Sequence, residues 1–208
     1  MTTKVAIVDL GIGNFGSMAH MLTRVGVPSE RITEPSQLDS ASHVILPGVG
    51  AFDYAVEQMD AGGWRGPLND LFASGSVPVL CVCVGMQLLM QGSDEGERDG
   101  IGWINGRCRR FDVGDIGLKV PHMGWNDILT MKPCAILDSA SEEERFYFVH
   151  SYYCDCQDEG DIVATTRYGI EFASVVRRGS VTGVQFHPEK SHAFGMALLR
   201  RFTESTVT

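Results

Sequence analysis

A short apolar run passes directly into a helical pattern between residues 77 and 90, with Cys83 at the junction. The run Val77–Val82 is rich in β-branched residues and carries a proline at its start, which is typical of a central strand. The stretch Val84–Met90 then spaces its apolar residues as a helix does. A thiol at such a junction lies on a sharp turn over the amide-rich end of a helix. Both features favour the reactive thiolate.

The same alternation of short apolar segments and helical patterns runs through the first hundred residues. Because strands that alternate with helices form parallel sheets, the pattern predicts a parallel sheet with helices on both faces. Strands are expected at Val5–Leu10, Arg31–Thr33, His43–Leu46 and Val77–Val82, and helices near Ser17–Val25, across Phe52–Leu71 with a break at Gly62-Gly63, and after Cys83.

After Gly100 the apolar segments become closely spaced and lose the intervening helices. This change predicts an antiparallel section in the C-terminal half, so the expected fold is an open α/β sheet that is mixed but mostly parallel. With no linker, repeat or composition break, residues 1–208 are expected to form a single domain. In this half a helix is expected at Ala193–Phe202, and strands are expected at Cys108–Phe111, Ile128–Met131, Phe146–Tyr153, Ile162–Thr166, Ala173–Arg178 and Val181–Phe186.

The charge and hydropathy of the chain narrow the classes of partner. A net charge of -9 and a pI of about 5.1 argue against binding to nucleic acid or to an anionic membrane, because both require a basic surface. No apolar run approaches the roughly 20 residues of a membrane span, and the N-terminal apolar stretch is interrupted at Asp9. We therefore expect a cytoplasmic protein.

Two further patterns suggest ligands that the rest of the sequence does not support. The six cysteines include the pairs Cys81/Cys83 and Cys154/Cys156, but zinc sites use a longer Cys-x₂-Cys spacing, so no metal is expected. The segment Gly11–Gly16 matches the G-x-G-x-x-G dinucleotide fingerprint. No strand ending in an acidic residue follows at about the required 20 residues, so we interpret it as an interaction loop.

A histidine and a carboxylate stand two positions apart in His187-Pro188-Glu189, at the end of another apolar segment. With Cys83 they supply a nucleophile, a base and a group that orients the base. The loop Pro47-Gly48-Val49-Gly50 follows a third strand, and its glycines permit unusual peptide orientations, so an N–H there can face a developing oxyanion. Ligands of open α/β sheets bind at the carboxyl ends of the strands, where all these residues are expected to meet. The remaining histidines are expected at the surface or in the core.

Taken together, these segments resemble the class I, triad-type glutamine amidotransferases, which have a flavodoxin-like fold, and within them the glutaminase subunits of imidazole glycerol phosphate synthase. The Cys and His-Pro-Glu motifs are shared by all triad amidotransferases, whereas two further segments are specific to this subfamily. The matching segments run nearly end to end and are Asp9–Asn14, Leu46–Phe52, Cys83–Leu89, Pro121–Asn126, Phe148–Tyr152 and Gly183–Ser191, of which Pro121–Asn126 and Phe148–Tyr152 are the subfamily-specific ones.

The resemblance implies a reaction and a set of roles. Cys83 attacks the side-chain amide of glutamine to form a glutamyl thioester, His187 protonates the departing ammonia and then activates water, and Glu189 orients His187. No cofactor is implied. The other implied roles are an oxyanion hole from the N–H groups of Val49 and Val84, glutamine binding by Gly48, Gly50, Gln87, Glu95, His150, Ser151 and Tyr152, and a partner interface at Asn14, Trp125 and Lys190.

The implied partner is a separate cyclase subunit with a (βα)₈ barrel, which forms a heterodimer with this chain and receives the ammonia. It makes imidazole glycerol phosphate and aminoimidazole carboxamide ribonucleotide in histidine biosynthesis, and it stimulates the glutaminase allosterically. The alternatives are a paralogous glutaminase feeding a different barrel, such as one that amidinates a surface-polysaccharide sugar, a noncatalytic module of the same fold, and a cysteine protease. The intact triad argues against the noncatalytic module.

One residue departs from the family pattern. The family usually has glycine two positions before the nucleophile, and this chain has Cys81 there. The turn at a nucleophile is crowded, so a side chain at this position needs room. We therefore expect reduced or redox-sensitive activity from this pair of closely spaced thiols.

Overall fold

The computed structural model of the protein describes residues 4–114, 117–137 and 144–207. Its strands are β1 (Val5–Val8), β2 (Ser29–Ile32), β3 (His43–Gly48), β4 (Val79–Cys83), β5 (Gly106–Arg110), β6 (His122–Asp127), β7 (Leu129–Thr130), β8 (Arg145–His150), β9 (Tyr152–Cys156), β10 (Ile162–Tyr168), β11 (Ile170–Arg178) and β12 (Val181–Val184). Its helices are α1 (Phe15–Arg24), α2 (Phe52–Ala61), α3 (Arg65–Ser74), α4 (Val84–Gln87) and α5 (His192–Glu204), and its 3₁₀ turns are η1 (Pro35–Ser40), η2 (Glu159–Asp161) and η3 (Pro188–Lys190).

A large mixed sheet runs through the molecule in the order β2-β1-β3-β4-β12-β11-β10-β7. The five strands from β2 to β12 are parallel, and β11, β10 and β7 continue the sheet antiparallel. Strand β4 lies between β3 and β12, so the loops after these three strands emerge together. The expected mostly parallel sheet with an antiparallel C-terminal section is confirmed.

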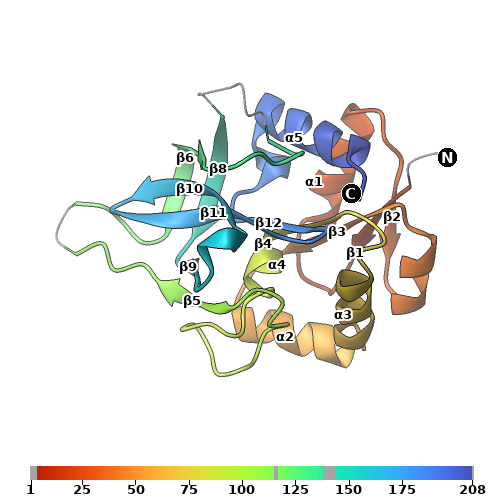
Figure 1. Cartoon of the computed structure of the whole chain (residues 1–208), viewed down its shortest axis with the longest axis horizontal. Coiled ribbons are helices and arrows are strands. Elements are labelled where there is room, and N and C mark those ends of the chain that lie inside the picture. Colours follow the sequence, from red (N-terminus) through yellow and green to blue (C-terminus); the bar gives the residue numbers. More distant parts are fainter. Residues whose placement is uncertain (1–3, 115–116, 138–143, 208) are drawn as a thin grey trace.

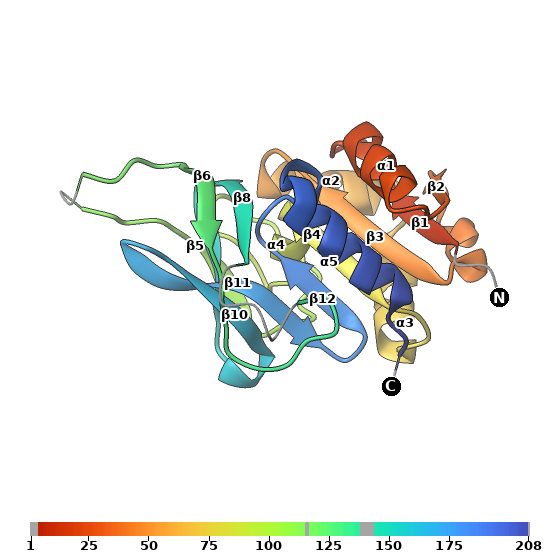
Figure 2. The ribbon, with the colours of Figure 1, turned by 90° about the horizontal axis from the view of Figure 1, so that it is seen from above.

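Helices cover both faces of the parallel section (Figure 1). Helices α1 and α5 pack together on one face, and α2 and α3 lie on the other, as the view from above also shows (Figure 2). The predicted helical region from 52 to 71 is indeed divided at Gly62-Gly63 into α2 and α3. Buried apolar side chains of the helices, such as Leu22, Phe52 and Leu198, join those of the strands in one core.

The C-terminal half adds two smaller pairings beside the main sheet. Strands β6 and β8 form a separate antiparallel ribbon, and β9 links β5 to β11. The single strand expected at Phe146–Tyr153 was wrong, because the chain breaks at Ser151 and its halves enter different sheets. Strand β6 was not predicted, since Gly124, Asn126 and Asp127 have low strand propensity and are ordered by pairing with β8.

The helix after Cys83 is confirmed but lasts only one turn. Beyond it, the backbone of residues 88–90 bonds to the segment around 100–104 instead of continuing the helix: Ile101 N donates to Leu88 O at 2.7 Å, and Ile104 N donates to Leu89 O at 2.9 Å. Gly100 permits this close approach, because a Cβ there would lie 2.1 Å from Met90 O.

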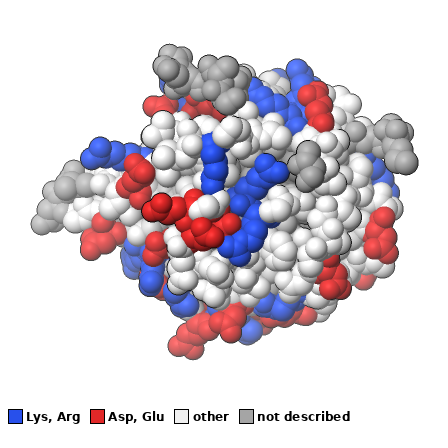
Figure 3. Space-filling model, viewed as in Figure 1, with Lys and Arg blue, Asp and Glu red and all other residues white. Residues whose placement is uncertain are grey.

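The charged surface is mixed in sign. Figure 3 shows Lys and Arg side chains interspersed with Asp and Glu over one face, and several of the chain's charges are paired, as in Arg178–Asp161 and Arg109–Asp94. This mixture of signs on the face shown in Figure 3 fits the net charge of -9. Among the described helices, none has the length and apolar character to span a membrane.

Candidate active site

Cys83 lies at the end of the central strand in a strained backbone conformation. Its φ of 56° and ψ of -110° are rare for a residue with a side chain, and its side chain is buried. The helix α4 begins at the next residue, so the predicted sharp strand-to-helix turn is confirmed. Gly85 makes the turn sterically feasible, because a Cβ at this position would lie 2.1 Å from Leu46 O.

His187 and Glu189 form a buried pair beside this turn. They follow β12, the neighbour of β4, and η3 turns the carboxylate back toward the imidazole. His187 Nδ1 donates to Glu189 Oε1 at 2.8 Å, and both side chains are at most 4% exposed. The backbone is fixed on each side, since His187 N donates to Tyr147 O and the Ser191 hydroxyl donates to His187 O.

The surroundings of His187 favour its charged form. Burial lowers the pKa of His187, but hydrogen bonds to Cys83 and Glu189, together with the charges of both, raise it to about 9. Nδ1 is occupied by Glu189, which leaves Nε2 for Cys83. The imidazolium form of His187 is therefore favoured at neutral pH, with a proton available at Nε2.

Cys83 and His187 open onto a cavity of about 340 Å³, whereas Glu189 lies behind His187, outside the cavity lining. It contains most of the residues that the sequence singled out, although Gly48 lies beneath it and supports the turn: a Cβ there would approach Gly85 N to 2.7 Å. The lining comprises Val49, Gly50, Cys83, Val84, Gln87, Glu95, Pro121, Val149, His150, Ser151, Tyr152, His187 and Lys190.

Glu95 is held over the cavity by contacts with the start of α2. Its Oε2 accepts from Phe52 N at 2.8 Å, which also places a negative charge at the positive end of that helix. Asp53 holds the same loop by accepting from Glu97 N and Arg98 N at 3.0 and 3.1 Å. The sequence analysis missed Asp53, because no motif links it to a loop more than forty residues away.

His150 lines the cavity and begins a buried series of neutral groups that extends behind it. Its Nδ1 donates to Tyr152 O at 2.8 Å, and its Nε2 lies 3.0 Å from Nδ1 of His122. Burial lowers the pKa of His122 to about 4 and that of His150 to about 3. Both imidazoles are therefore neutral at physiological pH and match the expectation of satisfied core histidines. The hydrogen-bonding role of His122 was not anticipated.

Of the residues expected at a partner interface, Trp125 lies on the β6–β8 ribbon, Lys190 lies beside it, and Asn14 lies at the start of α1. Trp125 is 44% exposed and stacks on His192 with ring centroids 5.7 Å apart. Lys190 lies over the Tyr147 ring at 6.0 Å and also lines the cavity. Asn14 caps α1 by accepting from Ser17 N. The first turn of α1 and Lys190 share a second cavity of about 290 Å³, so both lie on one side of the molecule.

No group of three or more potential metal ligands occurs within residues 4–114, 117–137 and 144–207.

Comparison with known proteins identifies close relatives over the full length. The model of the family "Glutamine amidotransferase class-I" matches residues 6–205. A protein of Bdellovibrio bacteriovorus named "Imidazole glycerol phosphate synthase subunit HisH" is 43% identical over 202 residues, which is 96% of this chain and 99% of the relative. A protein of Salinibacter ruber with the same name is 42% identical over 213 residues, which is 100% of this chain and 96% of the relative.

Solved structures share the fold at lower identity. A structure titled "glutamine amidotransferase" superposes with a TM-score of 0.74 at 21% identity, covering 96% of this chain and 97% of its own. The structure titled "PurLQS from Thermotoga maritima" gives a TM-score of 0.75 at 17% identity, covering 98% of this chain and 99% of its own.

Proposed function

Because the chain belongs to the class I glutamine amidotransferases, and within them to the HisH subunits of imidazole glycerol phosphate synthase, we propose that it hydrolyses glutamine through Cys83, His187 and Glu189. The ammonia then serves the synthase reaction of histidine biosynthesis. The observation that carries the proposal is the buried imidazole of His187, which is bonded to Glu189 on one side and to Cys83 on the other.

In the first half of the reaction, the Cys83 thiolate attacks the carbonyl carbon of the glutamine side-chain amide. A carbon–sulfur bond forms, and the tetrahedral intermediate collapses as the carbon–nitrogen bond breaks. His187 Nε2–H gives its proton to the leaving nitrogen, which departs as ammonia. In the second half, the now neutral His187 takes a proton from water, the hydroxide attacks the thioester, and glutamate leaves as the thiolate is restored.

Backbone N–H groups beside Cys83 are suited to stabilise the oxyanion of each intermediate. Val84 is the first residue of α4, so its N–H has no acceptor within the helix. Val49 lies across the cavity, between Gly48 and Gly50, and Gly50 has a φ of 99° that only glycine adopts readily. We propose Val49 and Val84 as the two donors.

The remaining lining residues are proposed to hold the amino-acid end of glutamine. Gln87 Nε2 donates to Tyr152 O and to Gln185 Oε1, so its own Oε1 is the atom left to accept from the substrate ammonium. Glu95 uses Oε2 on Phe52 N and offers its other oxygen to the same ammonium. The backbone of His150, Ser151, Tyr152 and Gly50 is proposed to complete the cradle, and Gly48 to support it from beneath.

The ammonia acceptor is proposed to be a (βα)₈-barrel cyclase on a separate polypeptide, with which this single domain forms a cytoplasmic heterodimer. Exposed apolar side chains on the β6–β8 ribbon support an interface there, since Met123 and Trp125 are 61% and 44% exposed. Lys190 and Asn14 lie on the same side, and Lys190 lines both the active-site cavity and the second cavity beside α1.

The experiment is to measure glutamate release by this chain alone, and then with a histidine-pathway cyclase and its nucleotide substrate. We expect low activity alone and strong stimulation by the loaded cyclase. Glutamate release that is equally fast in its absence would contradict the coupling. Labelling of Cys83 by a glutamine-mimicking alkylator without stimulation would point to a different barrel partner, and no labelling would overturn the proposed nucleophile.

A further inference from the structure

Gln185 is a fully buried polar residue that has no role in the reaction as derived above. It follows β12 directly and precedes His187 by two residues. Its side chain is 0% exposed, and its backbone N donates to Ser174 O at 2.9 Å. A buried amide is costly unless its donors and acceptor are bonded, so the contacts of this side chain have to account for its position.

The Gln185 amide bridges the nucleophile and a cavity-lining residue. Its Nε2 donates to Cys83 Sγ at 3.7 Å, and its Oε1 accepts from Gln87 Nε2 at 3.2 Å. The orientation of both amides follows from Tyr152 O, which can only accept, so the Gln87 atom facing it at 3.1 Å is the nitrogen. Because the Gln87 nitrogen can only donate, the Gln185 atom that faces it is the oxygen Oε1. The nitrogen Nε2 of Gln185 therefore faces Cys83 Sγ.

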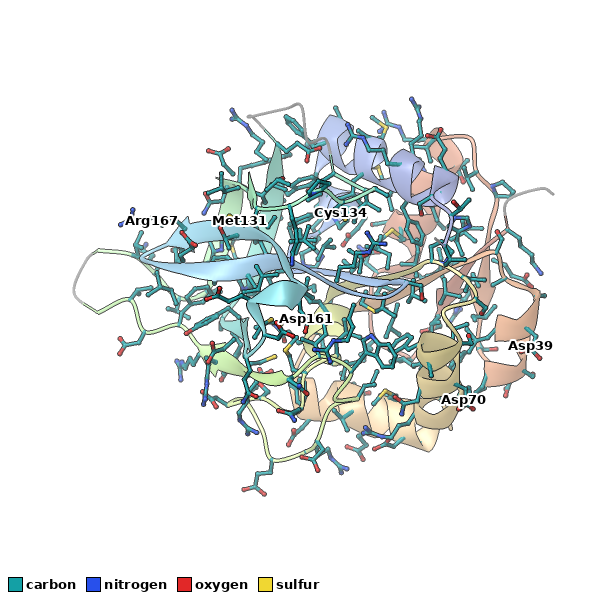
Figure 4. All side chains as sticks on the ribbon, viewed as in Figure 1. Asp39, Asp70, Met131, Cys134, Asp161 and Arg167 are labelled. Carbon is teal, nitrogen blue, oxygen red and sulfur yellow. The ribbon has the colours of Figure 1, made fainter. Side chains whose placement is uncertain are left out.

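A second series of hydrogen bonds between neutral groups also ends at Tyr152 O, from the other side. His150 Nδ1 donates to Tyr152 O, so its neutral Nε2 accepts from His122 Nδ1. His122 Nε2 in turn accepts from Asn126 Nδ2, which also donates to the backbone O of Arg167 near the end of the β10–β11 hairpin (Figure 4). Every donor therefore faces an acceptor, from the hairpin to the sulfur.

We propose that Gln185 is a further catalytic residue, whose Nε2–H donates to Cys83 Sγ, stabilises the thiolate and fixes its orientation on the strained turn. This inference rests on the proposed function of Cys83. A hydrogen bond to a charged acceptor is roughly twice as strong as one to a neutral acceptor. Because the amide nitrogen cannot accept a proton, the contact favours sulfur in its ionised form.

Other titratable groups also act on Cys83, and a test has to separate them from Gln185. His187, with Glu189 behind it, is the neighbouring cation. The thiol of Cys154 lies on β9, and its hydrogen bond to Cys108 together with burial raises its pKa, which keeps it neutral. Replacing Gln185 leaves all of these in place, so a changed thiolate population in such a variant reports the amide alone.

The test uses the full chain and two variants. Q185M keeps the length of the side chain but removes its N–H, and S174A is the matched core control, since Ser174 Oγ is buried without a partner. The rate of iodoacetamide alkylation of Cys83 is followed against pH by peptide mass spectrometry. We expect the midpoint to rise by about one pH unit in Q185M, with alkylation slowed about tenfold at pH values below the parental midpoint. S174A should match the parent.

A measurement on the parent protein covers the case in which Q185M does not fold. The side-chain amide protons of Gln185 should shift in NMR spectra as Cys83 ionises, and should stop titrating once Cys83 is alkylated. Amide resonances indifferent to Cys83, or a folded Q185M with the parent midpoint, would overturn the inference alone. A parent Cys83 that resists alkylation, or glutamine turnover that survives C83A, would instead overturn the proposed function.

Discussion

Two histidines of this protein are both buried but differ in protonation. His187 is 1% exposed and its pKa is raised to about 9, whereas His150 is 6% exposed and its pKa is lowered to about 3. Burial lowers the pKa in both cases. The difference comes from partners: His187 faces a carboxylate and a thiol, and His150 faces a carbonyl oxygen and a neutral imidazole.

The comparison teaches that the same side chain serves opposite purposes within one cavity wall. The charged imidazole of His187 stores a proton for the leaving group. The neutral imidazoles of His122 and His150 stay fixed in one tautomer and align hydrogen bonds across the site. A change that removes a charged partner should therefore alter chemistry, and a change that removes a neutral partner should alter stability and its dependence on pH.

The largest effect is expected from C83A, which removes the thiolate partner of His187. Glutamine hydrolysis should fall by at least about a thousandfold, because no other group supplies the nucleophile. The pKa of His187 should fall in this variant, since hydrogen bonding to Cys83 is a main cause of the raised value. Glutamate release and an NMR titration of His187 measure both outcomes. Turnover within a few fold of the parent would move the nucleophile elsewhere.

The second largest effect is expected from E189Q, which removes the carboxylate partner of His187 but keeps the shape of the side chain at position 189. Turnover should fall by about a hundredfold, and the pKa of His187 should drop. A raised pKa also means that His187 contributes stability below about pH 6.5 that is lost as pH rises through about 9. Denaturant unfolding at pH 7 and 9.5 should show a smaller alkaline loss in E189Q. The exposed E171Q is the control, and an alkaline loss equal to the parent's would contradict this account.

The third largest effect is expected from H122Q, which tests the neutral pair of His122 and His150. The folded-state pKa of about 4 lies below the ordinary value, so the unfolded chain binds more protons and stability falls as pH drops from about 7 toward 4. Between pH 7 and 5 this histidine accounts for about 2 kcal/mol of that loss. H122Q should be less stable at pH 7 but should lose about 2 kcal/mol less on acidification. The exposed H20Q should keep the parental slope, and an identical slope in H122Q would refute the prediction.

The sequence allowed the charged half of this comparison to be predicted, but not the neutral half. Cys83, His187 and Glu189 each follow a strand of the parallel section, and strand ends of such a sheet converge, so their meeting could be anticipated. His122 and His150 meet only through the register of β6 and β8. Strand β6 of that ribbon was not predicted, because its glycine, asparagine and aspartate mask the strand pattern.

Contacts made by loops were also beyond sequence reasoning. Asp53 fixes the loop of Glu95 through two backbone N–H groups, a pairing that no spacing rule encodes. Gln185 was visible within the segment that contains His187, but its role depends on the orientation of an amide that only its three-dimensional neighbours determine. Local propensity therefore indicated the elements and their ends, whereas the hydrogen-bond partners required the folded chain.

The smallest effect is expected at Cys81, which extends the comparison from imidazoles to thiols. Cys81 lies in β4 between Leu46 and Gly183 of the neighbouring strands and is 0% exposed. Burial raises the pKa of its thiol far above the ordinary value, with no charged partner to oppose this effect, so it lacks the thiolate needed for exchange with Cys83. The sequence favoured reduced or redox-sensitive activity from this pair, and its burial favours an inert core residue.

The two interpretations separate in C81A. If the thiol is inert, turnover should stay within about threefold of the parent, stability should fall by about 1 kcal/mol, and peroxide should inactivate both proteins at the same rate through Cys83. Protection from peroxide in C81A, or a Cys81–Cys83 linkage in peptide maps of the oxidised parent, would instead favour the redox interpretation. It would also show that burial without a charged partner does not keep a thiol from ionising, although it keeps the imidazoles of His122 and His150 neutral.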